Sequence, residues 1–110
     1  MERRAFGKTG MNLSVLGFGG SEIGWLGTDP SNVERLLNEA LDAGLNIIDT
    51  AECYVDSETK IGNAVSHRRQ DFFLFTKCGH AFQGASELAE WSPELLRASL
   101  ENSLKCLRTD

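Results

Sequence analysis

Three polar residues at separate points of the chain could together carry out proton-transfer chemistry. Asp49 ends a short apolar run, Tyr54 follows it by five residues, and Lys77 ends a second apolar run. A phenol is a weak acid with a reference pKa of about 10. A neighbouring ammonium stabilises the phenolate, and a carboxylate keeps the ammonium charged and oriented. A phenol in this setting can donate a proton at neutral pH, as a carbonyl oxygen requires when its carbon receives a hydride.

Each of these residues also has an ordinary structural explanation. Asp49 could cap a turn or helix, Lys77 could be a solvated strand end, and Tyr54 could be a half-buried packing residue. Spacing along the chain leaves both explanations open. The choice depends on the elements that position the three side chains.

Short apolar runs alternate with amphipathic segments along the whole chain. Residues 3–7 and 12–16 flank a turn around Gly10 and predict a hairpin, and residues 13–19 predict a strand that ends in glycines. Residues 45–49 and 72–77 predict two further strands, and a polar loop follows at residues 78–91.

Three helices are predicted between and after these strands. The first begins at Asp29 and Pro30, a capping residue followed by a proline, and ends at Gly44. The second begins near Ser57 and ends in the solvated cations of residues 67–69. The third repeats the cap and proline at residues 92–93. Apolar spacing predicts the inward face of each of these helices. For the first helix the inward residues are Val33, Leu36, Leu37, Ala40 and Leu41. For the third helix they are Leu95, Leu96, Ser99, Leu100, Ser103, Leu104 and Leu107.

The resulting order predicts an α/β fold with a parallel sheet and right-handed crossovers. A repeat of roughly 30 residues fits a βα unit of an eightfold barrel or of a doubly wound sheet. Both architectures place chemistry at the C-terminal ends of strands. Neighbouring strands lie about 4.8 Å apart, so we expect Asp49 and Lys77 to approach each other at one rim, with Tyr54 folded over them.

Several motifs in order resemble the aldo-keto reductase family: Gly44–Tyr54, Ser57–Gly62 and Phe75–Lys77, with Phe6–Gly10, Leu16–Gly19 and Ser103–Asp110 in addition. The resemblance implies a partial (β/α)₈ TIM barrel, in which residues 1–110 supply an N-terminal β-hairpin plus three βα units and stop before the fourth strand. It also implies NADPH-dependent reduction of aldehydes and ketones to alcohols.

The resemblance assigns roles to particular residues. Asp49, Tyr54 and Lys77 match the family's catalytic aspartate, proton-donating tyrosine and lysine. Gly20 and Ser21, together with Asp49, are expected beside the nicotinamide of NADP(H). No metal site is expected.

Three departures from the family pattern or from related motifs concern the loops. The family's histidine belongs to the fourth strand, and His80 is either a substitute for it or a polar loop residue. Val55 stands where the family usually has glycine, and a β-branched residue does not easily adopt φ > 0, so we expect a differently shaped loop. Residues 17–22 do not form a Rossmann motif, because Glu22 replaces the third glycine and we expect no helix there.

Composition argues against two classes of partner. A formal charge of −5 makes nucleic acid and anionic membranes poor partners. The chain lacks a long apolar run and a leader-like N-terminus. Three cysteines, an odd number spaced far apart, are expected to be reduced thiols in a cytoplasmic protein. The resemblance to aldo-keto reductases implies a small carbonyl compound as the substrate.

Length leaves two alternatives open. A TIM barrel needs roughly 250 residues, so we expect residues 1–110 alone to be inactive, as an incomplete domain without most of the cofactor site. A second hypothesis is a non-catalytic segment that associates, with its own copies or other proteins, through open sheet edges. A TIM-barrel lyase or isomerase would also use a carboxylate and a lysine, but it would not predict Tyr54.

Overall fold

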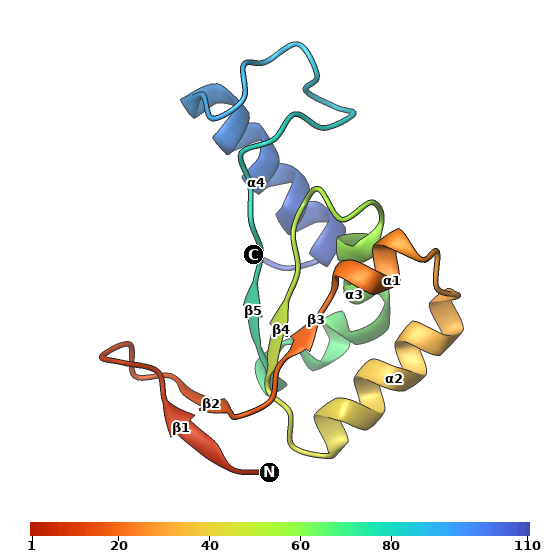
Figure 1. The fold of residues 1–110 in the computed structure, drawn as a ribbon, viewed down its shortest axis with the longest axis vertical. Coiled ribbons are helices and arrows are strands. Elements are labelled where there is room, and N and C mark those ends of the chain that lie inside the picture. Colours follow the sequence, from red (N-terminus) through yellow and green to blue (C-terminus); the bar gives the residue numbers. More distant parts are fainter.

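Three short parallel strands form the sheet at the centre of the structure (Figure 1). The computed structural model describes residues 1–110. Strands β3 (Phe18–Gly19), β4 (Ile47–Asp49) and β5 (Phe73–Phe75) lie in the order β3-β4-β5. The register places Gly19 beside Asp49, so the C-terminal ends of the strands meet at one rim, as predicted.

A separate antiparallel hairpin precedes the sheet and lies at its lower end in Figure 1. It pairs β1 (Arg3–Ala5) with β2 (Asn12–Ser14), which confirms the predicted hairpin. The predicted continuous strand over residues 13–19 is wrong, because the chain bends between β2 and β3. Two hydrogen bonds hold the bend: the Ser14 hydroxyl donates to the Leu16 carbonyl oxygen (2.6 Å), and the Ser14 N–H donates to the Asn46 side chain (2.7 Å).

Helix α2 (Pro30–Asp42) begins and ends where the sequence predicts. The Asp29 carboxylate accepts the Ser31 N–H at 2.9 Å, and Gly44 adopts a left-handed φ of 93° after the last turn. Most of the predicted inward face is buried or half-buried, but Leu36 is 45% exposed.

Helix α3 (Ser57–Val65) continues into a 3₁₀ helix, η1 (Ser66–Asp71). The arginines of η1 were expected to be solvated, and this expectation is wrong. Arg68 forms ion pairs with Asp42 (2.8 Å) and Asp71 (2.9 Å). The Arg69 guanidinium donates to the Thr109 hydroxyl at 2.9 Å. These side chains therefore join η1 to the end of α2 and to the C-terminal residues.

Helix α4 (Pro93–Leu107) packs beside α3 and is capped as predicted. The Ser92 hydroxyl accepts the Leu95 N–H at 3.2 Å. Its buried face contains two leucines and two serines, but the predicted inward residue Leu100 is 54% exposed. The helix thus keeps an apolar side chain that no other element covers.

A short helix, α1 (Ser21–Trp25), follows β3. The prediction that no helix begins near Glu22 is therefore wrong. Tertiary contacts hold this helix: the buried Lys60 ammonium donates to the Ile23 carbonyl oxygen at 2.9 Å. Glycine at position 24 is required because a Cβ there would lie 2.0 Å from a carbonyl oxygen of the loop after β4.

The hydrophobic core lies between the sheet and helices α2 and α3. Ile48 of β4 is fully buried, which places one face of the sheet against these helices. None of the helices combines the length and the apolar character needed to cross a membrane. The core residues are Ile23, Val33, Leu37, Leu41, Leu45, Ile48, Ile61, Ala64, Val65, Phe72 and Leu107.

Candidate active site

The ends of β4 and β5 bring a lysine and an aspartate together. The Lys77 ammonium donates to the Asp49 carboxylate at 2.7 Å and to the Thr50 carbonyl oxygen at 2.8 Å. Burial of the ammonium lowers the pKa of Lys77, but the hydrogen bond and charge of Asp49, together with smaller contributions from Tyr54, outweigh burial and leave the pKa raised. Lys77 therefore stays positively charged at neutral pH.

Tyr54 lies over this pair, in the loop that joins β4 to α3. The Lys77 ammonium nitrogen is 5.4 Å from the centre of the Tyr54 ring. On another side, the ring of Trp25 in α1 lies 6.5 Å from the Tyr54 ring, centre to centre. The structure thus brings together the carboxylate, the ammonium and the phenol that the sequence places at separate positions.

Two buried hydroxyl groups connect the beginning and the end of the Tyr54 loop. The Thr50 and Ser57 hydroxyls are 2.9 Å apart, and Ser57 donates to the Gly20 carbonyl oxygen at 2.7 Å. The Gly20 N–H donates to the Asp49 carbonyl oxygen at 2.7 Å. Both backbone groups of Gly20 are therefore used within the fold, and the half-buried Ser21 starts α1 at the same rim.

Val55 corrects one of the predictions for this loop. Its φ is 52°, so the β-branched residue adopts the left-handed conformation that was expected to be avoided. The side chain is 65% exposed and gains little packing in return. An L-residue with a Cβ pays about 1–2 kcal/mol in this region of φ/ψ space. Backbone hydrogen bonds stand on either side of Val55: the Tyr54 N–H donates to the Ala51 carbonyl oxygen, and the Ser57 N–H donates to the Tyr54 carbonyl oxygen.

Replacing Val55 by glycine is therefore expected to stabilise the fold by about 0.5–1 kcal/mol, since relief of left-handed strain exceeds the entropic cost of glycine. Urea unfolding of the two proteins measures the difference. Val15→Gly is the matched control, because Val15 is 45% exposed without a positive φ and should lose stability on substitution. Loss of stability in both variants would contradict the strain at Val55.

A cavity of about 280 Å³ opens beside Tyr54 and Lys77. His80 and Trp91 line it from the loop after β5, with their rings edge to face at 5.6 Å between centres. The His80 Nδ1 atom lies 3.5 Å from the Glu90 carboxylate. His80 thus shares the cavity with Tyr54 and Lys77, although it lies in the polar loop predicted from sequence. The other lining residues are Ala51, Glu52, Cys53 and Cys78, which sequence reasoning did not assign to the site.

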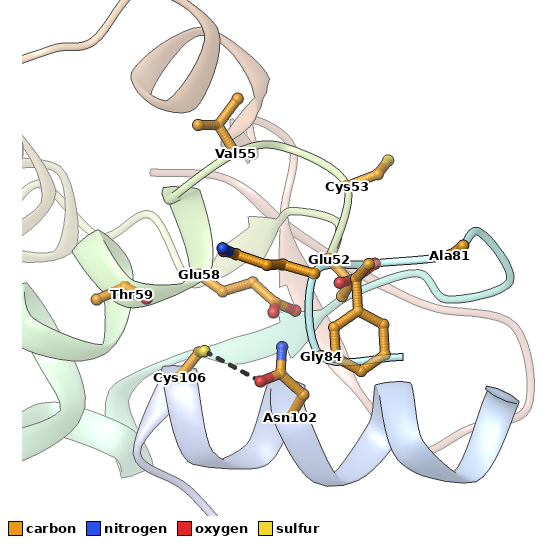
Figure 2. Close-up of a pocket in the computed structure, with 11 residues that line it drawn as sticks. Glu52, Cys53, Val55, Glu58, Thr59, Ala81, Gly84, Asn102 and Cys106 are labelled. Atoms are coloured by element: carbon orange, nitrogen blue, oxygen red, sulfur yellow. Dashed lines mark hydrogen bonds between the residues drawn. The ribbon is translucent and has the colours of Figure 1, made fainter. Parts of the chain in front are cut away.

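A second cavity, of about 610 Å³, lies between the Tyr54 loop, residues 81–84 and α4 (Figure 2). The carboxylates of Glu52 and Glu58 and the amide of Asn102 point toward its interior (Figure 2). It is larger, but neither Tyr54 nor Lys77 lines it. The smaller cavity is therefore the one that Tyr54 and Lys77 share.

The ionised carboxylate of Glu52 destabilises the folded state, so this cost depends on pH. Burial and the charge of Glu58 raise its pKa, and His80 opposes them in part. A raised carboxyl pKa contributes stability below the unfolded pKa of about 4.3, which is lost as pH rises through the folded pKa.

Glu52→Gln is consequently expected to gain stability over the parent chain as pH rises from about 4 to about 7. Urea unfolding across this range measures the difference. Glu101→Gln changes an exposed carboxylate on α4 and should give a difference that does not depend on pH. Parallel pH curves for Glu52→Gln and the parent would show that no buried charge is involved.

Comparison with known proteins places these features in one family. The sequence model of the Aldo/keto reductase family matches residues 15–110. An uncharacterized oxidoreductase of Bacillus subtilis, YqkF, is 32% identical over 114 residues, which cover all of this chain and 36% of that protein. L-galactose dehydrogenase of Arabidopsis thaliana is 32% identical over 117 residues, covering all of this chain and 35% of the enzyme.

Two further similarities bear on length and fold. An uncharacterized 11.2 kDa protein of Pseudescherichia vulneris is 37% identical over 91 residues, which cover 72% of this chain and 87% of that protein. A solved structure from Pseudomonas aeruginosa, provisionally described as an aldo-keto reductase, superposes with a TM-score of 0.85 at 36% identity over 98% of this chain and 42% of its own.

The chain spans about a third of the length of the two longer curated relatives. Its hairpin and parallel β–α units match part of an aldo-keto reductase TIM barrel, which confirms the predicted fold class. Because the family model covers residues 15–110 and the structural match extends over nearly the whole chain, the chain belongs to the aldo/keto reductase family.

Proposed function

We propose that the protein containing this chain is an oxidoreductase that uses NADPH to reduce small aldehydes and ketones to alcohols. The observation that carries the proposal is the convergence of three groups at one rim of the sheet: Tyr54 and Lys77 line one cavity, and Asp49 binds the Lys77 ammonium. Family membership supports nicotinamide-dependent chemistry on a carbonyl. The odd number of cysteines supports a reducing, cytoplasmic compartment.

The rim beside Asp49 fits a flat cofactor ring. Gly19 pairs with Asp49 across the sheet, and a Cβ at Gly19 would meet no atom within 4 Å, so the space above the strand ends is open. We assign Asp49, Gly20 and Ser21 to the nicotinamide side of the site: Asp49 and Ser21 through their side chains, and Gly20 by holding the rim in place. NADPH bound there would supply the hydride.

In the proposed mechanism Tyr54 is the acid. Its hydroxyl donates a proton to the carbonyl oxygen as negative charge develops there. The Lys77 ammonium, 5.4 Å from the ring centre, stabilises the phenolate that remains. Asp49 accepts a 2.7 Å hydrogen bond from Lys77 and so fixes the direction and charge of the ammonium. His80 and Trp91 wall the space in which the substrate would lie.

The cavity and the relatives favour a small, hydroxylated substrate. A cavity of about 280 Å³ lies near the lower limit of small-molecule sites. Glu52 and His80 offer hydrogen-bonding groups, and Trp91 offers an aromatic wall. Among the relatives are an L-galactose dehydrogenase and a 6-dehydroglucose reductase, whose names specify sugar compounds. Sugar-like carbonyl compounds are therefore the first substrates to test.

The direct test measures loss of NADPH absorbance with hydroxylated and unsubstituted aldehydes of equal chain length. We expect aldehyde-dependent oxidation of NADPH by the enzyme that contains this chain. For residues 1–110 alone we expect no turnover and no saturable NADPH binding, because three parallel strands supply under half of an eight-stranded barrel. Cofactor oxidation that never depends on the aldehyde would refute the proposed function.

An association role is the second candidate, and the open sheet favours it. Both β3 and β5 are edge strands, and edge strands offer unpaired backbone groups to other chains. The half-buried aromatic residues of β5 add apolar surface there. Light scattering over a range of protein concentrations tests this role: a mass that rises with concentration supports it, and a constant mass excludes it.

A further inference from the structure

Two exposed cysteines flank the residues proposed for catalysis. Cys53 immediately precedes Tyr54, and Cys78 immediately follows Lys77. Both thiols are exposed, and both line the 280 Å³ cavity. Neither cysteine has a part in the proposed carbonyl reduction, although both line the cavity in which that reaction is proposed to occur.

The backbone brings these cysteines together. The Thr50 N–H donates to the Phe75 carbonyl oxygen at 2.9 Å, and the Glu52 N–H donates to the Lys77 carbonyl oxygen at 3.1 Å. These bonds continue the β4–β5 ladder up to the residues just before the two cysteines. Adjacent strands lie about 4.8 Å apart, and a disulfide requires Cα atoms about 4.4–6.8 Å apart. The register places Cys78 beside Glu52, so Cys53 lies one residue further along and the two cysteines are diagonal neighbours. Diagonal neighbours on such a ladder have Cα atoms about 6 Å apart, which is within this range.

We propose that Cys53 and Cys78 form a peroxide-sensitive dithiol that closes into a disulfide across the mouth of the cavity. Disulfides in reducing compartments are typically transient and redox-sensing, and exposed thiols are the ones that oxidants reach. Oxidation would convert the two thiols into a covalent disulfide, so the pair is a candidate site of reversible modification.

The chemistry balances with hydrogen peroxide as oxidant. One thiolate attacks the O–O bond, which gives a sulfenic acid and releases water. The second thiol attacks that sulfur, the S–S bond forms, and a second water leaves. The two thiols lose two electrons and two protons in total, and hydrogen peroxide is reduced to two water molecules. A dithiol reductant reverses the reaction by thiol–disulfide exchange.

Closure would also affect the neighbouring site. The disulfide would join the segments after β4 and β5, between which Tyr54 and Lys77 meet the cavity. We expect the oxidised protein to admit substrate poorly and to recover with reductant. This consequence rests on the proposed function, whereas formation of the bond does not.

Cys106 provides an internal comparison. It lies on α4 with its thiol directed at the Asn102 side-chain oxygen, at 3.9 Å (Figure 2). Cys53 borders the larger cavity as well, but Figure 2 shows it on the far side of Glu58 from Cys106. The structure therefore favours Cys78 over Cys106 as the partner of Cys53.

The test treats the folded chain with stoichiometric hydrogen peroxide, blocks remaining thiols with an alkylating agent, and measures intact and peptide masses. We expect loss of two hydrogen atoms, one alkylated thiol at Cys106, and a cross-linked peptide pair that contains Cys53 and Cys78. Cys106→Ser should give the same disulfide, whereas Cys53→Ser and Cys78→Ser should give none within the chain.

Three results would overturn the proposal: equal oxidation of all three thiols without an internal bond, a bond to Cys106, or disulfides only between copies. The mass measurement needs no enzymatic activity, so it distinguishes failure of the dithiol from failure of the proposed function. If the disulfide forms but the active enzyme that contains this chain keeps its full rate, the proposed disulfide is supported and its proposed effect on substrate access is refuted.

Discussion

Tyr54→Phe is expected to lower kcat for carbonyl reduction by about 10²–10⁴-fold, the range for loss of a general acid. The substitution removes one hydroxyl and keeps the ring that lies beside Trp25 and the Lys77 ammonium. Because the ring still packs in the loop, substrate binding should change far less than turnover. Steady-state kinetics of the enzyme that contains this chain separates the effects on kcat and KM.

Thr59→Val is the matched control for this experiment. Thr59 also carries a hydroxyl, but it lines the larger cavity rather than the one beside Tyr54. Its loss should leave kcat within about threefold of the parent rate, well short of what loss of a general acid gives. A Tyr54→Phe enzyme that works at a similar rate to this control would remove the phenol from the mechanism.

Gly62→Ala is expected to destabilise the fold by about 3 kcal/mol, at the upper end of the usual cost of overpacking. A Cβ at this position would lie 2.2 Å from the Cys106 carbonyl oxygen and 2.9 Å from the Leu107 carbonyl carbon. These atoms belong to the backbone of α4, so no side-chain rotation can relieve the overlap. Urea unfolding measures the loss.

The direction of the stability change in Gly62→Ala distinguishes a glycine in close packing from one in an open helix. Alanine is favoured over glycine by about 1 kcal/mol in an open helix, so a glycine without a packing role would gain stability on substitution. The neighbouring Asn63→Ala changes an exposed position of α3 and should leave stability within about 0.5 kcal/mol or raise it slightly. A more stable Gly62→Ala protein would show that α3 and α4 are not in close contact.

Local chemistry explains why the helix boundaries could be predicted. The caps at Asp29 and Ser92 satisfy N–H groups two or three residues away, and a proline stands next to each cap. The interaction needs no distant partner. The same holds for Gly44, whose left-handed φ ends a helix without help from the rest of the fold.

The wrong predictions concern segments whose backbone conformation depends on contacts with distant parts of the chain. Helix α1 lacks a capping side chain of its own, and the Lys60 ammonium from α3 binds its Ile23 carbonyl oxygen. Val55 adopts φ > 0 although its side chain disfavours that conformation, and its loop is tied at both ends to distant segments: the Glu52 N–H donates to the Lys77 carbonyl oxygen and the Ser57 hydroxyl donates to the Gly20 carbonyl oxygen. No window of neighbouring residues contains these constraints.

The sequence by itself determined that strands and helices alternate and that Asp49 and Lys77 stand at strand ends, because periodicity and capping are local properties. Only the tertiary structure decided that two cysteines spaced far apart in the sequence border one cavity, and that His80 joins them there. The physical reason is the parallel pairing of β4 with β5, which places residues after each strand side by side regardless of the chain length between them.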